Sequence, residues 1–210
     1  MYEEIKRKIN IYRRYKYWAD AKCIFIHVPK SAGTSVSKAI YGRTLGHYSA
    51  AEISNAFPDL YKNSFTFGFV RNPWDRVLSA YSFAKLGRTS VMGVRNPEQY
   101  KIEEFSTFER FVCEWLPNQN LEKVDFIFRQ QSDYLCDREG EIAVDKVGFV
   151  ETLDLDLGEI ARRLNKKIDV VRENSTRGAD DKYRDYYSIE MRDIVACLYS
   201  KDIENFGYVF

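Results

Sequence analysis

Two short apolar segments, each followed at once by a polar turn and a helical pattern, constrain the fold of this chain most. They span residues 23–28 and 65–70, and both are rich in β-branched and aromatic residues. A third such run covers residues 147–150, and residues 124–128 form a fourth candidate. Short apolar runs that alternate with helices are typical of a parallel sheet covered on both faces. We therefore expect the α/β class, with a single domain built on a central, mainly parallel β-sheet flanked by helices.

Helical patterns connect and follow these strands. Residues 74–85 form one, and residues 107–116 form another behind a capping box at residues 106–109. Asp156 with Glu159 is expected to cap a helix that runs to about residue 164. Residues 172–184 are polar and predict a loop. The stripe of a last helix consists of Met191, Ile194, Val195 and Leu198.

The N-terminal residues 2–18 predict a basic helix. Tyr2, Ile5, Ile9 and Tyr12 recur at helical spacing among several lysines and arginines. We expect residues 1–22 to pack as a helix on a domain of residues 23–210. Peripheral contact with a membrane surface or an acidic partner is a second interpretation, and a solvated helix face is a third.

Composition excludes some functions for the chain as a whole. The 210 residues are 45% hydrophobic, which suffices for one substantial core. Lysine and arginine number 32 against 31 acidic residues, so a net charge of +1 gives no argument for binding nucleic acid. Any charge that binds a phosphate must therefore be local.

The cysteines predict neither a metal site nor a redox centre. Cys23, Cys113, Cys136 and Cys197 are scattered singly, without the close pairs that zinc or dithiol motifs require, so we expect free thiols and no metal. No apolar run approaches the roughly 20 residues that span a bilayer, and no signal-peptide pattern is present. A cytoplasmic location is the expectation.

The turn after the first strand is a candidate anion site. A strand that enters a tight loop and then a helix directs main-chain N–H groups at one point, where a phosphate or sulfate is stabilised. Gly33 permits close approach of the backbone. The loop is not the common nucleoside-triphosphate motif, because its lysine precedes the glycine. An ordinary turn with a solvated lysine is the alternative. The candidate binding residues are Lys30, Ser31, Ala32, Gly33, Thr34 and Ser35.

The second strand leads into a similar element. Arg71 stands at the strand's end, Pro73 suits the first helical position, and Ser79 lies two turns into the helix. The guanidinium and the hydroxyl could reach one phosphate. The alternative is that Arg71 or Arg76 merely pairs with a carboxylate such as Asp75.

Together these two motifs resemble the sulfotransferase superfamily that uses 3′-phosphoadenosine 5′-phosphosulfate (PAPS), in particular its carbohydrate branch, the sulfotransferase family 2-like proteins. The resemblance runs from about residue 23 to residue 210. It implies a P-loop-like loop at residues 29–35 that holds the 5′-phosphosulfate. It also implies that Arg71 and Ser79 hold the 3′-phosphate, that 3′-phosphoadenosine 5′-phosphate (PAP) is the product, and that no metal is needed.

The reaction needs a cation beside the sulfonate and a base for the acceptor hydroxyl. Lys30 fits the first role, and the resemblance implies the same assignment. His47 resembles the proposed catalytic histidine of the branch, and it is our candidate base. A structural or substrate-orienting role is its alternative, and Glu52 and Glu151 are reserve bases. His27, inside the first strand, is expected to be structural.

The acceptor is less well defined by the sequence. A hydroxyl-bearing acceptor, in particular a carbohydrate, follows from the resemblance. The aromatic stretch of residues 81–134 could form a sugar-binding wall, but core packing explains its helical spacing more simply. The polar residues that could close over the nucleotide are Asn174, Ser175 and Arg177.

Two competing functions remain open at this point. Strand-loop-helix cradles also serve kinases and other phosphotransferases, although the Gly-Lys-Ser/Thr order is missing here. A noncatalytic nucleotide-binding module is the other alternative. The presence of Lys30 and of a candidate base argues against it.

Overall fold

The computed structural model describes residues 2–88, 93–94, 96–168 and 182–210. These residues divide into two compact units, residues 2–70 with 131–168, and the described residues of 71–130 with 182–210. The predicted boundary at residue 22 stays a prediction.

The first unit contains the sheet. Its strands lie in the order β1-β2-β3 and are parallel, with Ile26 opposite Gly68 and Gly68 opposite Val147. The α/β class with a parallel sheet flanked by helices is thereby confirmed. The elements of this unit are α1 (Tyr2–Tyr12), α2 (Tyr15–Ala21), β1 (Cys23–Ile26), α3 (Gly33–Tyr41), α4 (Ala50–Ala56), α5 (Pro58–Lys62), β2 (Phe65–Val70), α8 (Ser132–Leu135), β3 (Lys146–Phe149), η5 (Val150–Thr152) and α9 (Leu153–Leu164).

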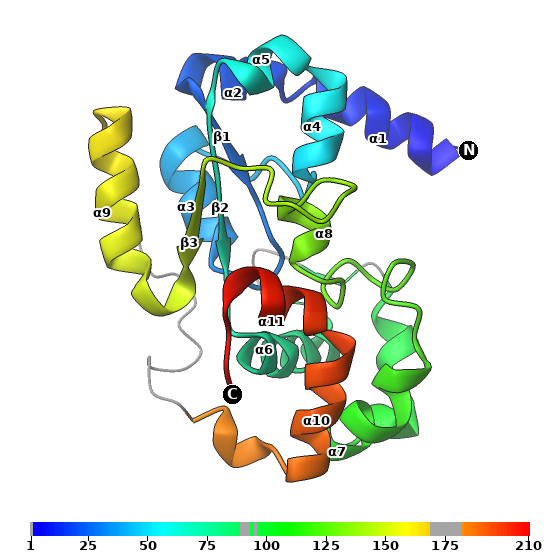
Figure 1. Cartoon of the computed structure of the whole chain (residues 1–210). Coiled ribbons are helices and arrows are strands. Elements are labelled where there is room, and N and C mark those ends of the chain that lie inside the picture. Colours follow the sequence, from blue (N-terminus) through cyan, green and yellow to red (C-terminus); the bar gives the residue numbers. More distant parts are fainter. Residues whose placement is uncertain (1, 89–92, 95, 169–181) are drawn as a thin grey trace. The chain divides into compact units, whose positions relative to one another are not determined.

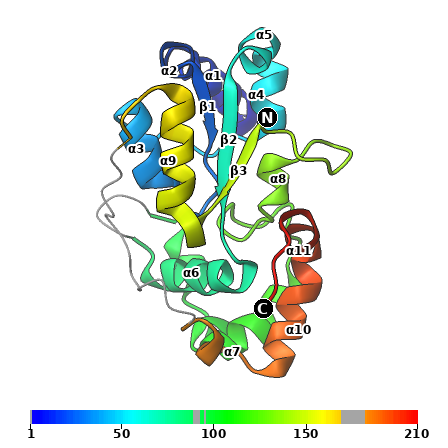
Figure 2. The ribbon, with the colours of Figure 1, turned by 60° about the vertical axis from the view of Figure 1, so that its left-hand side comes forward.

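Helices cover both faces of this sheet, as the apolar strands predict (Figures 1 and 2). One face carries Phe25 and Phe67, which pack with Val36 of α3 and Ile160 of α9. On the other face, Gly68 lets the Leu135 side chain of α8 approach the strand, because a Cβ atom at Gly68 would lie 2.4 Å from Leu135 Cδ2. The sheet is therefore held rigidly between two helical layers.

The second unit is helical and begins where β2 ends. Its core joins α6 to α10 and to the segment around η3, and it buries Phe105 and Phe111 as the core interpretation predicted. Its elements are α6 (Pro73–Leu86), η1 (Pro97–Tyr100), η2 (Glu103–Phe105), α7 (Phe108–Arg110), η3 (Phe111–Trp115), η4 (Leu116–Asn118), η6 (Arg184–Tyr186), α10 (Ile189–Leu198) and α11 (Ser200–Phe206).

Two expectations for the second unit are wrong. Residues 124–128 form turns instead of a strand, since the Asp125 side chain accepts the Ile127 main-chain N–H and both Ile127 and Phe128 are buried in a helical core. The helix at residue 108 is capped by Thr107, whose hydroxyl accepts the Arg110 N–H, so the capping box at residues 106–109 does not form.

Asp156 also differs from its predicted role. Helix α9 begins three residues earlier, at Leu153, so Asp156 is not its cap. Its carboxylate accepts hydrogen bonds from the Phe149 N–H and the Thr152 hydroxyl and pairs with Lys146. The aspartate therefore ties the end of β3 to the start of α9.

The N-terminal segment is broken into α1 and α2 by a turn at residues 13–14. Most of the expected apolar stripe does not face the protein: Ile5 and Ile9 are each 52% exposed, and Tyr12 is 62% exposed although its ring packs edge-on against Phe57. Ile11 and Trp18 are buried in their place. No helix in the described ranges is long and apolar enough to cross a membrane.

Candidate active site

The loop after β1 has an unusual backbone. Lys30 and Ala32 have φ values of 65° and 56°, whereas Ser31 between them is not in the positive-φ region. Left-handed conformations in non-glycine residues cost free energy and cluster at ligand-binding loops. Alternation of this kind turns successive N–H groups toward one side and forms an anion-binding concavity. Lys30 and Ala32 thus have backbone conformations of the kind that such anion-binding loops use.

Helix α3 follows this loop directly. Ala32 occupies the N-cap position and provides no side-chain cap for the first N–H groups of the helix. A serine, threonine or aspartate at this position would satisfy one of them. A helix of nine residues with an uncapped N-terminus is a suitable partner for an anionic group. Lys30, Thr34 and Ser35 are all partly exposed around it.

Ser31 differs from the other residues of the loop. Its side chain is buried, and its hydroxyl lies 3.1 Å from Oε1 of the fully buried Gln131. The hydroxyl therefore donates to Gln131, so that Ser31 offers a ligand mainly its main-chain N–H. Gln131 was not predicted, because nothing in the sequence connects it to a loop 100 residues away.

Gly33 is required by a neighbouring ring. A Cβ atom at this position would lie 2.0 Å from His27 Cδ2, so no larger residue fits without a shift of the imidazole. His27 is itself buried, and its Nδ1 atom has no hydrogen-bond partner among the described residues. Burial and the neighbouring His47 hold the pKa of His27 well below its ordinary value. The ring is therefore neutral and serves as the packing surface behind the loop.

Gly33→Ala should destabilise the protein by about 1–3 kcal/mol, the usual cost of overpacking a well-packed site. The matched control is Gly158→Ala, in the exposed interior of α9, where a Cβ atom meets nothing within 4 Å. That control should stabilise by about 0.5–1 kcal/mol. Urea unfolding of both variants measures the difference, and equal stabilities would contradict the packing of His27 on Gly33.

His47 lies directly beside this packing surface. The centroids of the His27 and His47 rings are 4.1 Å apart, and His47 Nδ1 lies 2.8 Å from the His27 main-chain oxygen. A carbonyl oxygen can only accept, so Nδ1 of neutral His47 carries the proton and Nε2 is the basic nitrogen. The structure therefore brings the candidate base and the candidate phosphosulfate loop together within one unit.

The ionisation of His47 follows from its surroundings. Burial lowers its pKa from 6.5 to about 4; the hydrogen bond to His27 opposes this effect, and the positive charge of Arg7 adds to it. The ring is therefore unprotonated at neutral pH, as a base must be before it accepts a proton.

Arg7 of α1 forms hydrogen bonds to the segment that contains His47. The Arg7 guanidinium donates to the His47 main-chain oxygen at 2.7 Å and to both carboxylate oxygens of Glu52, at 2.5 and 2.8 Å. It also stacks over the Tyr48 ring, 4.8 Å from its centroid. Nothing in the sequence indicates this role of Arg7, since its partners are 40 and 45 residues away.

Glu52 has a structural role that makes it a poor reserve base. It forms a capping box with Ser49 at the start of α4, and a Ser-x-x-Glu pattern in the sequence signals this. Burial acts to raise the pKa of Glu52, but the hydrogen bonds from Arg7 and the Ser49 main chain hold it below its ordinary value. The other reserve, Glu151, is exposed in η5.

Arg71 lies just before α6 in the second unit, and Ser79 lies within this helix. Arg71, Asp75 and Ser79 follow each other at intervals of four residues and are partly exposed, whereas most of the surrounding helix is buried. The Arg71 Nε atom donates to Asp75 at 2.7 Å, so the pairing named as the alternative does occur. Arg76 does not compete for Asp75; it is buried, and its guanidinium donates to the main-chain oxygens of Ile127 and Arg129.

The start of this helix is built as the sequence predicts. Pro73 occupies the first turn, and the Asn72 side chain accepts the Trp74 N–H. Arg71 directly follows Val70, the last residue of β2. Asn174, Ser175 and Arg177 lie outside the described residues.

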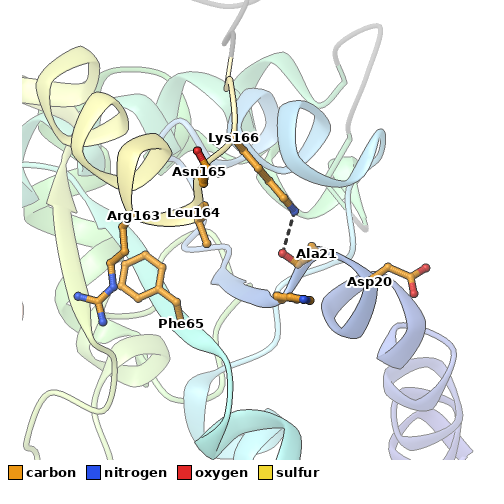
Figure 3. A pocket seen from close by; sticks show the side chains of 8 residues that line it. Asp20, Ala21, Phe65, Arg163, Leu164, Asn165 and Lys166 are labelled. Carbon is orange, nitrogen blue, oxygen red and sulfur yellow. Dashed lines mark hydrogen bonds between the residues drawn. The ribbon is translucent and has the colours of Figure 1, made fainter.

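A hollow of ≈ 460 Å³ lies elsewhere in the first unit (Figure 3). It is at the start of β1 and β2, lined among others by Lys22, Phe65 and Arg163, and Lys166 donates there to the Ala21 main-chain oxygen at 2.8 Å. Ligands of open parallel sheets bind at the carboxyl ends of the strands, which is where the loop of residues 29–35 leaves β1. None of the predicted site residues lines this hollow.

The remaining groups of the described chain provide no metal centre. No cluster of three or more histidine, cysteine or acidic side chains that could hold a metal ion occurs in the described ranges. The four cysteines are free thiols, of which Cys23 and Cys136 are buried and Cys197 is exposed.

Comparison with known proteins gave one match. A family model described as "Sulfotransferase family" matches residues 13–209. Neither the search of curated proteins nor the search of solved structures returned a match. The matched range includes the loop, His47, Arg71 and Ser79 but leaves out all of α1, including Arg7.

Proposed function

Because the chain belongs to the sulfotransferase family, we propose that its donor is PAPS and that its acceptor is a hydroxyl of a carbohydrate. The observation that carries the proposal is the alternating backbone at Lys30–Ser31–Ala32, which leads into an uncapped helix with His47 close by. When bound, PAPS supplies the sulfuryl group: its bond to the phosphate oxygen breaks as a bond to the acceptor oxygen forms.

The loop fits the 5′ end of such a donor. The N–H groups at the start of α3 and the Lys30 ammonium group provide positive potential for the phosphosulfate. Lys30 would stabilise the charge that develops on the departing phosphate, and a positioned donor of this type is worth a few kcal/mol. No metal ion is needed for this step.

His47 would accept the proton of the acceptor hydroxyl at Nε2. Its Nδ1–H remains bonded to the His27 carbonyl, which fixes the tautomer and the orientation of the ring. A base with a pKa of about 4 is weaker than the ideal near neutral pH. An anionic donor beside it favours the imidazolium and thus raises the pKa of His47 in the complex.

Arg71 and Ser79 would hold the 3′-phosphate. Their positions at the end of β2 and on the exposed side of α6 leave both side chains partly accessible. Asp75 holds Arg71 through Nε and so restricts the orientation of the guanidinium. This assignment comes from the family resemblance, and the partly exposed positions of Arg71 and Ser79 are compatible with it.

Arg71→Ala and Ser79→Ala should weaken the binding of PAP much more than the binding of adenosine 5′-phosphosulfate, which lacks the 3′-phosphate. Losing a hydrogen bond to a charged group costs about 1.5–3 kcal/mol, or roughly 10- to 100-fold in affinity. Of the two nucleotides, only PAP has the 3′-phosphate that would accept this hydrogen bond. Isothermal titration of both nucleotides measures this. Ser82→Ala is the matched control, because its exposed hydroxyl on the same helix donates to the Leu78 oxygen. Equal losses for the two nucleotides would remove the assignment of the 3′-phosphate.

The acceptor is tested by transfer of radiolabelled sulfate from PAPS to a panel of saccharides and to simple alcohols and phenols. Labelling of saccharides supports the proposed carbohydrate class. Labelling confined to phenols or steroid-like alcohols would leave the donor intact but replace the acceptor.

A further inference from the structure

Helix α1 has two faces of different character, and its contacts fix which one points outward. Arg7 is bound to Glu52 and to the His47 main chain, and Ile11, one turn later, is buried. Arg14 continues this side through a hydrogen bond to the Leu45 main-chain oxygen. These residues repeat at intervals of four and three, so they define the inward side of the helix.

The opposite side carries an exposed apolar row. Ile5 and Ile9, four residues apart, are each 52% exposed, and the row ends at Tyr12, which is 62% exposed although its ring packs edge-on against Phe57, with 5.0 Å between the ring centroids. Large apolar side chains that are grouped on one helix face, and not scattered, mark an interaction surface. Figure 1 shows the N-terminal end of α1 leading away from α4, which it contacts.

Cations flank this apolar row on both sides. Lys6 and Arg13, seven residues apart, lie along one flank, and Lys8 lies along the other; all three are exposed. The Arg13 N–H still bonds to the Ile9 oxygen, so this residue extends the helical face. Among the α1 side chains that the structure describes, from residue 4 onward, the one carboxylate is Glu4, seven residues before buried Ile11 and so on the inward side.

We propose that this outward face of α1 binds the surface of an anionic lipid membrane. An apolar row bordered by lysine and arginine matches a bilayer interface, where apolar side chains enter between the lipids and cations meet their acidic headgroups. Tyr12 suits the same boundary, since its ring is apolar and its hydroxyl is polar. The surface lies almost wholly outside the residues that the family model matches, 13–209. The inference is independent of the donor and acceptor proposed above.

The test is sedimentation of the full chain with vesicles of phosphatidylcholine alone or mixed with phosphatidylserine. We expect binding only to the mixed vesicles, weakened by added salt because exposed charges are screened. Ile5→Ser with Ile9→Ser should reduce the bound fraction about tenfold or more, and Lys6→Gln with Lys8→Gln should reduce it as well. The matched control is Leu155→Ser with Ile189→Ser, which removes two apolar side chains that are 76% and 73% exposed in α9 and α10.

Three results would overturn the proposal. The first is an absence of binding to the mixed vesicles at low salt. The second is equal binding by the α1 variants and by the control variant. The third is a concentration-dependent dimer, measured by light scattering, that the Ile5 and Ile9 substitutions abolish while vesicles fail to bind; a second copy of the chain would then cover this face.

Discussion

His47→Ala should retain binding of PAP but lose turnover by about 10² to 10⁴-fold, the usual contribution of a general base. The His47 ring packs against His27, which lies between it and Gly33, so its removal should leave Lys30 and the start of α3 in place. The loss should therefore appear in kcat and not in the affinity for the nucleotide. Turnover with an identified acceptor and titration of PAP measure the two quantities separately.

The pH dependence gives this prediction a second readout. The pKa of His47 is lowered to about 4, mainly by burial, so its basic form is populated throughout the neutral range. The acid limb of kcat/KM, which reports the free enzyme, should thus lie near pH 4 and not near 6.5. Glu151→Gln is the control and should have near-normal turnover. Near-normal turnover of folded His47→Ala would eliminate this residue as the base.

Lys30→Ala should lose both turnover and donor affinity, unlike His47→Ala, because the ammonium group contacts the donor before the reaction and stabilises charge during it. Removing a donor that stabilises developing charge costs about 10² to 10³ in kcat, and PAPS itself should bind more weakly. Alanine, like lysine, is a non-glycine residue, so the positive φ of this position is no easier to adopt in the variant.

The matched control for this variant is Lys38→Ala, which removes a cation from the last turn of α3, at the other end of the helix. It should leave turnover and donor affinity near normal. Turnover of Lys30→Ala equal to that of Lys38→Ala would contradict the assignment of Lys30 to the phosphosulfate.

The strands and the two strand-to-helix turns could be predicted because their signals are local. The β2 strand and the start of α6 have the predicted bounds to within one residue, since an apolar run and the Asn72-Pro73 pair specify them. The same local signal was misleading at residues 124–128. There an equally apolar run is buried among helices, and periodicity alone cannot distinguish that environment from a sheet.

Long-range contacts explain what the sequence could not reveal about the site. The inward side of α1 is marked by the pairing of Arg7 with Glu52, 45 residues away, whereas Ile5 and Ile9, in the stripe that the sequence predicts to pack on the domain, are exposed. Likewise, the buried partner of Ser31 is Gln131, which no motif indicates. The position of the loop could be predicted from the sequence, whereas the distant residues that contact it, such as Gln131, could be identified only from the structure.

The central claim is that this chain binds an adenosine nucleotide with phosphates at both its 3′ and 5′ positions. Thermal unfolding with PAP, compared with ATP and magnesium, GTP and AMP, tests it most directly. At about 100 times its dissociation constant, a ligand of the native state stabilises by roughly 2.7 kcal/mol, a shift of roughly 5 to 10 °C for a chain of this size. We predict such a shift with PAP and a clearly smaller one with the other nucleotides. An equal or larger shift with ATP and magnesium would contradict the account.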